Sequence, residues 1–516
     1  MIAALGRRLD RLAGRYMPDP FVLAIGLTFV VAVLGVLLGE KFAADADWIE
    51  RISVTVSSWK SFLFEPPHPT QGVNRKLLYF AFQMCLMLVT GHALASSPPV
   101  ARFVRRLAQI PQSFEAAVTL VSFTACFMAL IHWGLGLIVG AMIARESGRE
   151  LARRKIAHHY PLLGAAGYTG LMVWGGGLSG SIPLAAAGQA QIPLQDTLFS
   201  TLNLIISGAL LIFVPWICRF LVPRETETML PYVEGDTQES VPATHPQAHR
   251  WGLRFGVLFG LGSIAAYYMS LGINTPVQVI YALLNAGLVG LVGYHLVTLF
   301  SPDDNGEQSP AERLNNSAIL VALLSVMALG WLESEVLSDQ FKLSFNNLNF
   351  AFLFLGLLFQ GRPIRYVQAV SDGAKGCAGI ILQFPLYFGI LGIMVGTGLA
   401  AVFTDAMVGI ASESSYPIFT YFSAGLVNLF VPSGGGQWIV QGSIVIDGAT
   451  AFNSPSIVSK SIMALTYGDA WTNMLQPFWA VPLLAITGLR ARDIIGYTAT
   501  VMILGGALTI TCLTLL

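Results

Sequence analysis

The sequence Val431-Pro432-Ser433-Gly434-Gly435-Gly436-Gln437-Trp438 interrupts a run of uncharged residues that extends from Pro417 to Ile446. A run of this length and hydropathy is typical of membrane depth. Proline removes a backbone donor and clashes with the preceding helical turn, and each glycine costs about 1 kcal/mol relative to alanine in a helix. A broken helix in hydrocarbon persists only where protein or a water-filled cavity satisfies the freed backbone groups. The stretch therefore predicts a candidate binding site inside a membrane protein.

The composition of the whole chain supports this interpretation. Of 516 residues, 54% are hydrophobic and only 11% are charged, whereas soluble domains carry about 25% charged residues. We therefore expect an all-α polytopic membrane protein that is embedded in the lipid bilayer. The net charge is zero, which gives no indication of a nucleic-acid partner. Five cysteines without CxxC spacing predict neither a disulfide nor a metal site, and no cofactor is implied.

Two apolar runs have the length that is expected of re-entrant hairpins. The first, about residues 116–144, is interrupted near its middle at 132–136. One membrane-spanning helix needs about 20 residues and two with a connection need about 40, so the run fits neither. Arginines flank it on both sides, which predicts that it enters and leaves by the same face. The second hairpin is the uncharged run that Pro432 and the glycine triplet interrupt, about residues 417–446.

Each hairpin is followed by an apolar span that is itself broken. The first broken span, about 161–188, is interrupted at 174–181, and the second, about 462–488, is interrupted at 467–477. At an offset close to 300 residues, Gln83 matches Gln383 and Tyr168 lies opposite Tyr467. The order of these features predicts an internal repeat.

The distribution of basic residues indicates that the second copy is inverted. No Lys or Arg occurs between Lys375 and Lys460, so the second hairpin lacks the basic flanks of the first. Basic residues gather on the cytoplasmic side of membrane proteins. We therefore predict about eleven transmembrane helices plus two re-entrant hairpins in an inverted-topology repeat, which is the architecture of a secondary transporter.

Three regions are expected along the chain. Residues 1–222 hold the first repeat, 223–366 a cytoplasmic loop and scaffold helices, and 367–516 the second repeat. Four arginines precede the first apolar span and predict a cytoplasmic N-terminus: Arg7, Arg8, Arg11 and Arg15.

The four interruptions should converge near the middle of the membrane. The N-termini of half-helices present unpaired N–H groups and a partial positive charge, which suits a carboxylate without any Arg or Lys. The predicted substrate-binding residues are Ser433, Gly434, Gly435, Gly436, Gln437, Gly175, Gly176, Gly177, Ser179, Ser181, Thr472 and Asn473. Two alternatives stay open: the glycines permit close helix packing, and the polar side chains satisfy the broken backbone.

Two residues are candidates for ion coupling. Asp469 lies well inside the second repeat, where an ionised carboxylate must be protonated, paired or hydrated. It could carry a coupling proton, ligate Na⁺ or cap a half-helix. His132, at the tip of the first hairpin, is an alternative proton carrier because histidine titrates near neutral pH, although a lone histidine is more often structural.

Tryptophans also stand at or beside all four breaks. They are Trp133, Trp174, Trp438 and Trp471. Aromatic packing is the default expectation for them, and the alternative is an apolar wall for a short alkyl chain.

Three segments carry a resemblance to a known family. Leu426–Gly442, Ile380–Pro385 and Gly468–Asn473 resemble the short-chain fatty acid uptake family, a member of the ion transporter superfamily. The resemblance implies a substrate such as butyrate or acetoacetate, proton symport, an elevator-like motion and a bacterial inner-membrane location. Whether the chain forms a homodimer is left open.

Functions other than a proton-coupled carrier are also possible for a sequence of this kind. A Na⁺-coupled carboxylate carrier or a Na⁺/H⁺ antiporter would use the same architecture. An intramembrane enzyme is disfavoured because no HExxH motif, GxSxG motif or pair of aspartates is present. A channel is disfavoured because the hairpins accompany broken spans in a repeat.

Overall fold

A computed structural model gives the fold, and the part of the chain that it describes is entirely without strands. The described residues are 20–43, 45–64, 75–223, 229–233, 246–271, 276–299, 309–338, 345–430 and 434–516. The chain divides into two compact units: residues 1–84, 105–234 and 376–516 form the first, and residues 85–104 and 235–375 the second.

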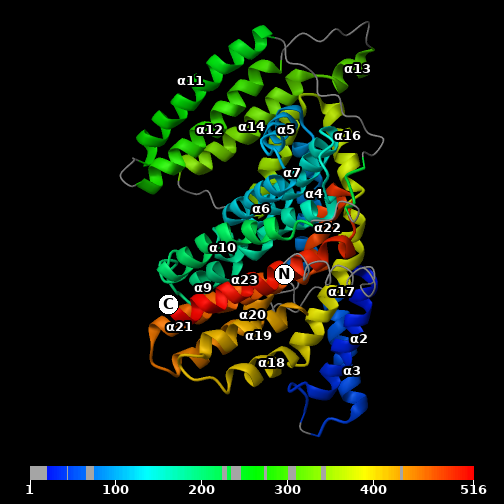
Figure 1. The fold of residues 1–516 in the computed structure, drawn as a ribbon, viewed down its shortest axis with the longest axis vertical. Coiled ribbons are helices and arrows are strands. Elements are labelled where there is room, and N and C mark those ends of the chain that lie inside the picture. Colours follow the sequence, from blue (N-terminus) through cyan, green and yellow to red (C-terminus); the bar gives the residue numbers. More distant parts are fainter. Residues whose placement is uncertain are drawn as a thin grey trace. The chain divides into compact units, whose positions relative to one another are not determined.

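The first unit contains the two candidate hairpins and the two broken spans (Figure 1). Its helices are α2 (Pro20–Leu38), α3 (Trp48–Phe64), α6 (Phe114–Ile131), α7 (Trp133–Arg153), α8 (Tyr160–Tyr168), η1 (Thr169–Met172), η2 (Trp174–Gly176), α9 (Ser181–Gln189), α10 (Thr201–Phe220), α17 (Cys377–Gly396), α18 (Leu399–Val408), α19 (Tyr416–Asn428), α20 (Gly434–Thr450), α21 (Pro455–Thr472), η4 (Asn473–Leu475), α22 (Pro477–Thr487) and α23 (Ala491–Leu515).

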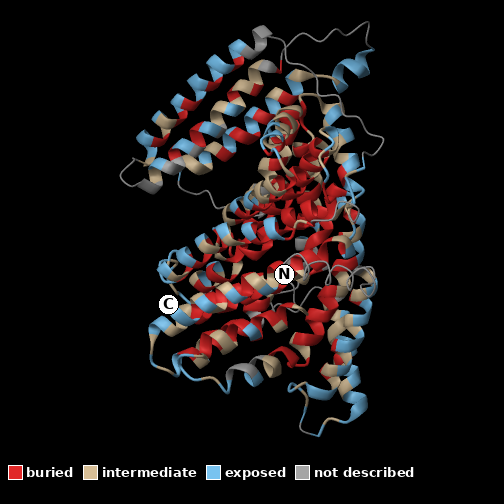
Figure 2. Ribbon diagram, viewed as in Figure 1, coloured by how far each residue is buried: buried red, intermediate tan, exposed pale blue. Residues whose placement is uncertain are grey.

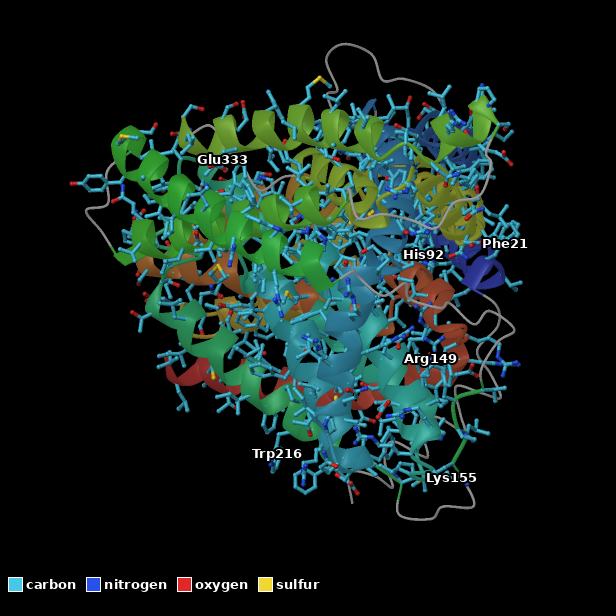
Figure 3. The ribbon with its side chains drawn as sticks, turned by 90° about the horizontal axis from the view of Figure 1, so that it is seen from above. Phe21, His92, Arg149, Lys155, Trp216 and Glu333 are labelled. Carbon is cyan, nitrogen blue, oxygen red and sulfur yellow. The ribbon has the colours of Figure 1, made fainter. Side chains whose placement is uncertain are left out.

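The second unit is a smaller helical bundle. Its helices are α11 (Pro246–Leu271), α12 (Pro276–Thr298), α13 (Pro310–Asn315), α14 (Ala318–Leu337), α15 (Phe345–Gln360) and α16 (Pro363–Ala374), while α4 (Arg75–Ala95) and α5 (Pro98–Gln109) cross the division. Glycines at 256, 260 and 290 let α11 and α12 approach backbone to backbone. Between α11, α12 and α14, Ser263 and Asn285 both donate hydrogen bonds to Glu333, which Figure 3 labels.

Seven helices in the described residues are long and apolar enough to cross a membrane, which makes this a multi-pass membrane protein. They are Phe21–Leu38, Phe114–Ile131, Thr201–Phe220, Arg250–Leu271, Pro310–Leu337, Cys377–Gly396 and Ala491–Leu515. The bent pair Ala81–Ala95 and Pro98–Gln109 would make an eighth. The predicted number of about eleven includes broken spans made of shorter helices, so it stays a prediction, as does the division into 1–222, 223–366 and 367–516.

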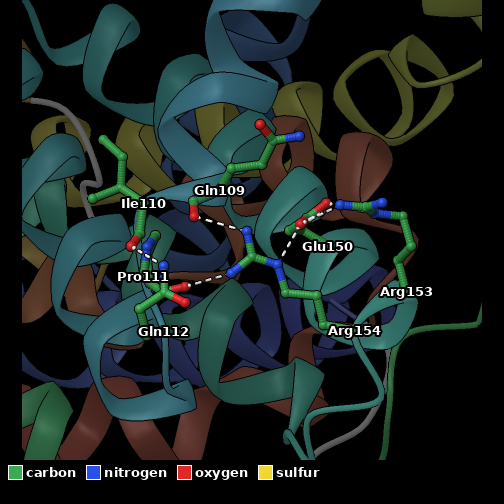
Figure 4. Close-up of polar contacts among 7 residues, drawn as sticks. All are labelled: Gln109, Ile110, Pro111, Gln112, Glu150, Arg153 and Arg154. Atoms are coloured by element: carbon green, nitrogen blue, oxygen red, sulfur yellow. Dashed lines mark hydrogen bonds and ion pairs between the residues drawn. The ribbon is translucent and has the colours of Figure 1, made fainter.

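The first candidate hairpin is longer than its apolar run. The helix α6 ends at Ile131, and α7 starts at Trp133 but continues nine residues past the predicted limit at Ala144. Ion pairs support this charged extension, since Arg153 and Arg154 both donate to Glu150 (Figure 4). The hydropathy pattern predicts only where the apolar residues end, at Ala144. The helix continues beyond that point because salt bridges between neighbouring turns stabilise its charged part.

The first broken span passes through two short 3₁₀ turns between α8 and α9. At the break, the backbone N–H of Leu178 donates to the carbonyl of Leu130 at the end of α6, at 2.8 Å. A Cβ on Gly177 would overlap the backbone of Leu130. The glycine therefore allows the broken segment to satisfy its backbone on the neighbouring helix.

The second broken span starts its interruption later than the sequence predicts. The helix α21 runs through Gly468 and ends at Thr472, and the break covers Asn473–Gln476 before Pro477 begins α22. A Cβ on Gly468 would overlap the carbonyl oxygen of Tyr421 in α19. Gly468 falls inside the predicted interruption but lies within α21, where its missing side chain allows α19 and α21 to pack closely.

In the first unit, α7, α8 and α21 consist mostly of buried residues, and Figure 2 shows those of α7 in red. One apolar core joins α9, α19, α20 and α21, and it includes Ile182, Ala424, Trp438 and Leu465. The start of α9 is thus held against the second hairpin by apolar packing.

Close packing at Gly468 gives a stability test. Gly468→Ala should lower the melting temperature of the purified protein, because the new Cβ meets backbone that cannot move away, at a cost of about 1–3 kcal/mol. Gly208→Ala is the matched control: Gly208 also lies inside a helix, α10, and has open space around it. The control should be neutral or stabilising, since alanine favours helix by about 1 kcal/mol. Equal melting temperatures for the two variants would contradict the role given to Gly468.

Candidate functional site

The beginning of α20 meets the first broken span and α21 at one point. A Cβ added to Gly434 would overlap Ser181 Oγ, and would lie 3.3 Å from Trp174 Cη2 and 3.4 Å from Asp469 Oδ2. These four residues come from η2, α9, α20 and α21. We call this group, Trp174, Ser181, Gly434 and Asp469, the polar junction.

Three side chains of the polar junction have a buried polar atom without a hydrogen-bond partner among the described residues. The atoms are Trp174 Nε1, Ser181 Oγ and Asp469 Oδ1. Native proteins rarely leave such atoms unpaired, and a ligand, an ion or a proton is a common reason. The junction offers two donors, an indole N–H and a hydroxyl, beside one carboxyl group.

Two helices point their N-termini into the junction. Ser181 is the first residue of α9, and no side chain caps that helix, while Gly434 is the first residue of α20. Helix N-termini carry a partial positive charge and free N–H groups, which favour an anion. The arrangement suits a single small carboxylate.

The first glycine triplet is placed for close packing. Gly175 faces Thr466 and Ala470 of α21, and Gly176 faces Asn203 and Ser207 of α10. A side chain at either position would overlap these neighbours. Together with Gly177 against α6, the triplet brings three helices around the break, which was the alternative left open for it.

Ser179 has a structural partner. Its Oγ accepts a hydrogen bond from the backbone N–H of Trp133 at 3.0 Å, which satisfies one of the free donors at the start of α7. Ser179 and Ser181 are thus only two residues apart but differ in their contacts.

The second glycine stretch contains several environments. Ser433 lies outside the described residues. Gly434 is enclosed in the polar junction, whereas a Cβ on Gly435 would meet nothing within 4 Å. Gly436 is half-buried. Gln437 is fully buried, and its Nε2 donates to the carbonyl of Ala424 and to Gln441 Oε1, both at 2.8 Å.

Thr472 and Asn473 bond to a residue that the sequence reasoning missed. Asn428 Nδ2, at the end of α19, lies 3.0 Å from Thr472 Oγ1, 2.9 Å from Asn473 Oδ1 and 2.8 Å from the carbonyl of Asp469. Gln476 Nε2 in turn donates to the carbonyl of Asn428 at 2.7 Å. These contacts satisfy the broken end of α21. A fully buried asparagine in the apolar run of α19 was the signal available in the sequence.

Two tyrosines connect the broken spans reciprocally. The hydroxyl of Tyr168, in the first span, lies 2.8 Å from the carbonyl of Asn473 and 2.7 Å from that of Gln476, at the break of the second. Tyr467, in the second span, donates to Asn203 Oδ1 at 2.9 Å, and Asn203 Nδ2 donates to the carbonyl of Gly176 at the break of the first. The second break is therefore contacted directly by Tyr168, and the first is linked to Tyr467 through Asn203 of α10.

His132 is a helix cap. It lies between α6 and α7, and its Nδ1 accepts a hydrogen bond from the backbone N–H of Gly134 at 3.1 Å. A ring nitrogen that accepts a hydrogen bond carries no proton, so in this structure Nδ1 is unprotonated. The ring is fully buried at the tip of the hairpin.

Of the four tryptophans, Trp174 is the one that reaches the polar junction. Trp438 lies in the apolar core, Trp133 packs edge-on against Trp479, and Trp471 stacks on Tyr421. Aromatic packing, the default expectation, describes these other three. Among the described residues, no group of three or more His, Cys, Asp or Glu is arranged to hold a metal ion.

Comparison with known proteins identifies the family. The family model described as short chain fatty acid transporter matches residues 1–233 and 300–516. A relative from Escherichia coli (strain K12) is 34% identical over the full length of both chains, and one from Haemophilus influenzae is 31% identical over 98% of this chain and 97% of its own. Both relatives are provisionally assigned as short-chain fatty acid transporters.

A solved structure, that of the Alcanivorax borkumensis YdaH transporter, aligns with 96% of this chain and 98% of its own at 13% identity. Its TM-score of 0.31 is too low to establish a common fold. The family match covers most of the sequence and the relatives cover all of it, which confirms the predicted resemblance. The chain belongs to the short-chain fatty acid transporter family.

Proposed function

We propose that this protein is a secondary carrier that moves short-chain monocarboxylates, such as butyrate or acetoacetate, across the bacterial inner membrane together with a proton. The observation that carries the proposal is the polar junction, in which Gly434, Ser181 and Asp469 converge at two helix N-termini. Membership of a transporter family supports transport rather than catalysis.

The junction has the groups that a monocarboxylate needs. The hydroxyl of Ser181 and the indole N–H of Trp174 supply two donors for the substrate carboxylate, and the N-termini of α9 and α20 supply positive potential. No lysine or arginine belongs to the junction. A carboxylate bound there would be held by neutral donors and helix N-termini and not by a fixed cation.

Asp469 explains how a proton would be coupled to this anion. Two carboxylates held within a few ångströms in a dry site cannot both be ionised at an acceptable cost. The substrate anion would bind when Asp469 carries a proton, and the protonated oxygen would donate to the substrate. When the substrate leaves on the other side, Asp469 releases its proton there, and the empty site returns with Asp469 ionised, so one proton moves with each monocarboxylate.

We retain the inverted repeat as part of the proposal. Besides the charge pattern, it is supported by the reciprocal contacts of Tyr168 and Tyr467, which occupy matching positions in the two broken spans. The second arms of the two hairpins also end alike. Lys155 after α7 and Asn453 after α20 both adopt positive φ, at 57° and 53°, a conformation that is uncommon for residues other than glycine.

Replacement of Asp469 tests the coupling. Asp469→Asn keeps the shape of a protonated aspartate but cannot release a proton. In proteoliposomes, labelled butyrate should still exchange across the membrane, while accumulation driven by a pH gradient should be lost. Asp405→Asn, at an exposed carboxylate in α18, is the control and should accumulate butyrate like the wild type. Accumulation by Asp469→Asn under a pH gradient, or accumulation by the wild type under a Na⁺ gradient alone, would contradict proton symport through Asp469.

The two neighbouring serines test the substrate contact. Ser181→Ala should raise the KM for butyrate about tenfold or more, because a hydrogen bond to a charged group contributes about 1.5–3 kcal/mol. Ser179→Ala removes the contact to Trp133 and should lower the melting temperature with little change in KM. A wild-type KM in Ser181→Ala would remove the N-terminus of α9 from the site.

Accessibility labelling tests the inverted arrangement. In a background without native cysteines, Ala157→Cys follows α7 and Ser456→Cys follows α20, and both positions are exposed. A membrane-impermeant maleimide should label Ala157→Cys from the cytoplasmic side and Ser456→Cys from the opposite side. Labelling of both from one side of the membrane would exclude the inverted repeat.

A further inference from the structure

Three arginines surround one buried glutamate at the charged end of α7. Arg149, labelled in Figure 3, donates to Glu146 Oε1 at 2.9 Å. The Nε of Arg145 lies 3.7 Å from the same carboxylate, and the Nε of Arg105, from α5, lies 3.6 Å from it. Glu146 itself is 7% exposed. We call Arg105, Arg145 and Arg149 the arginine cluster.

Two of these guanidinium groups have an Nε–H donor without a hydrogen-bond acceptor among the described residues. Arg105 and Arg145 lie at ion-pair distance from Glu146, but neither Nε atom has a hydrogen-bond partner in the described part of the chain. Arg154, just after α7, is better paired, with three hydrogen bonds from its guanidinium group. It donates to Glu150 and to the carbonyls of Gln109 and Pro111, as Figure 4 shows. Since a guanidinium carries five N–H donors, the cluster has donors left for a ligand.

The charge of the cluster is also not balanced. One carboxylate faces three guanidinium groups, which leaves two positive charges at a half-buried position. The sequence from 102 to 155 contains eight basic residues and three acidic ones, so the surroundings add positive potential and do not cancel it. The planar fork of arginine fits the oxygens of a phosphate group better than a single-point cation does.

The position of α5 indicates where the ligand comes from. This helix bends by 77° from the apolar helix before it. Phe103, on α5, and Ile110, just after it, are 60% and 62% exposed, although they stand beside arginines. Exposed apolar side chains next to basic ones are typical of a helix at the membrane–water interface. The cluster would then lie at the depth of lipid headgroups, on the side that the arginine distribution predicts to be cytoplasmic.

We propose that Arg105, Arg145 and Arg149 bind the phosphate of an anionic phospholipid. Glu146 holds the three guanidinium groups together in the absence of lipid, and the partly exposed side chains of the three arginines offer their remaining N–H donors to the headgroup. The site is separate from the polar junction, so it concerns the lipid requirement of the protein and not the recognition of its substrate.

Binding of phosphatidylglycerol to the purified full chain, measured by native mass spectrometry with phosphatidylcholine as the neutral comparison, tests the proposal. The wild type should prefer phosphatidylglycerol, and added NaCl should weaken that preference. The double variant Arg105→Gln/Arg145→Gln should bind phosphatidylglycerol roughly thirtyfold more weakly, since each basic residue beside an anionic headgroup contributes roughly fivefold. The double lysine variant at these positions should lie between the two.

Arg492→Gln is the matched control, because Arg492 is an exposed arginine of the same unit at the start of α23. It should retain wild-type binding. Equal phosphatidylglycerol binding by the double glutamine variant and the control would overturn the proposal. So would a wild type without preference between the two lipids, or one from which millimolar inorganic phosphate displaces phosphatidylglycerol, because the ligand would then be a free anion. If the double glutamine variant does not fold, the lysine variant and the salt dependence of the wild type decide the question.

Discussion

Backbone groups that leave a helix inside hydrocarbon must find other partners, and the first unit is organised by this requirement. At the end of α21, Asn428 donates to the carbonyl of Asp469 and Tyr168 adds a hydroxyl, while Gln476 donates to the carbonyl of Asn428 at the end of α19. At the other break, Leu178 uses the carbonyl of Leu130. Each unsatisfied group would cost several kcal/mol in the membrane. The buried amides and hydroxyls around the breaks are therefore a condition of the fold.

This requirement separates structural polar groups from candidate functional ones. Thr472, Asn473, Gln437 and Ser179 all have partners that satisfy a helix end or a neighbouring helix. Three of the buried polar atoms without a hydrogen-bond partner among the described residues lie together in the polar junction: Trp174 Nε1, Ser181 Oγ and Asp469 Oδ1. These three atoms come from different helices and meet at two helix N-termini, so one substrate carboxylate could reach several of them together. Family membership and this local deficit thus support the same function independently.

The sequence was sufficient for the class of protein and the family. Among the described residues, it also placed the end of α6 correctly, but it began the break of the second span too early. It was not sufficient for the difference between glycines, because Gly434 and Gly468 look equally disruptive in a helix while their neighbours decide their roles. Hydropathy also could not predict that Ser181 and Asp469, nearly 300 residues apart, both lie beside Gly434. That arrangement depends on the packing of α9 against α20 and α21. Asn428 was missed because a single asparagine does not interrupt an apolar run.

The reciprocal tyrosine contacts restrict how such a carrier could move. Tyr168 bonds directly to the break of the second span, and Tyr467 bonds to Asn203 of α10, which in turn bonds to the break of the first. Separating the spans would leave these buried hydroxyls and carbonyls without partners. At about 1–3 kcal/mol for each stranded group, such a separation is costly compared with the free-energy differences between the states of a transport cycle. Both breaks must then travel as one rigid body, and the sliding surface of the cycle must lie outside them.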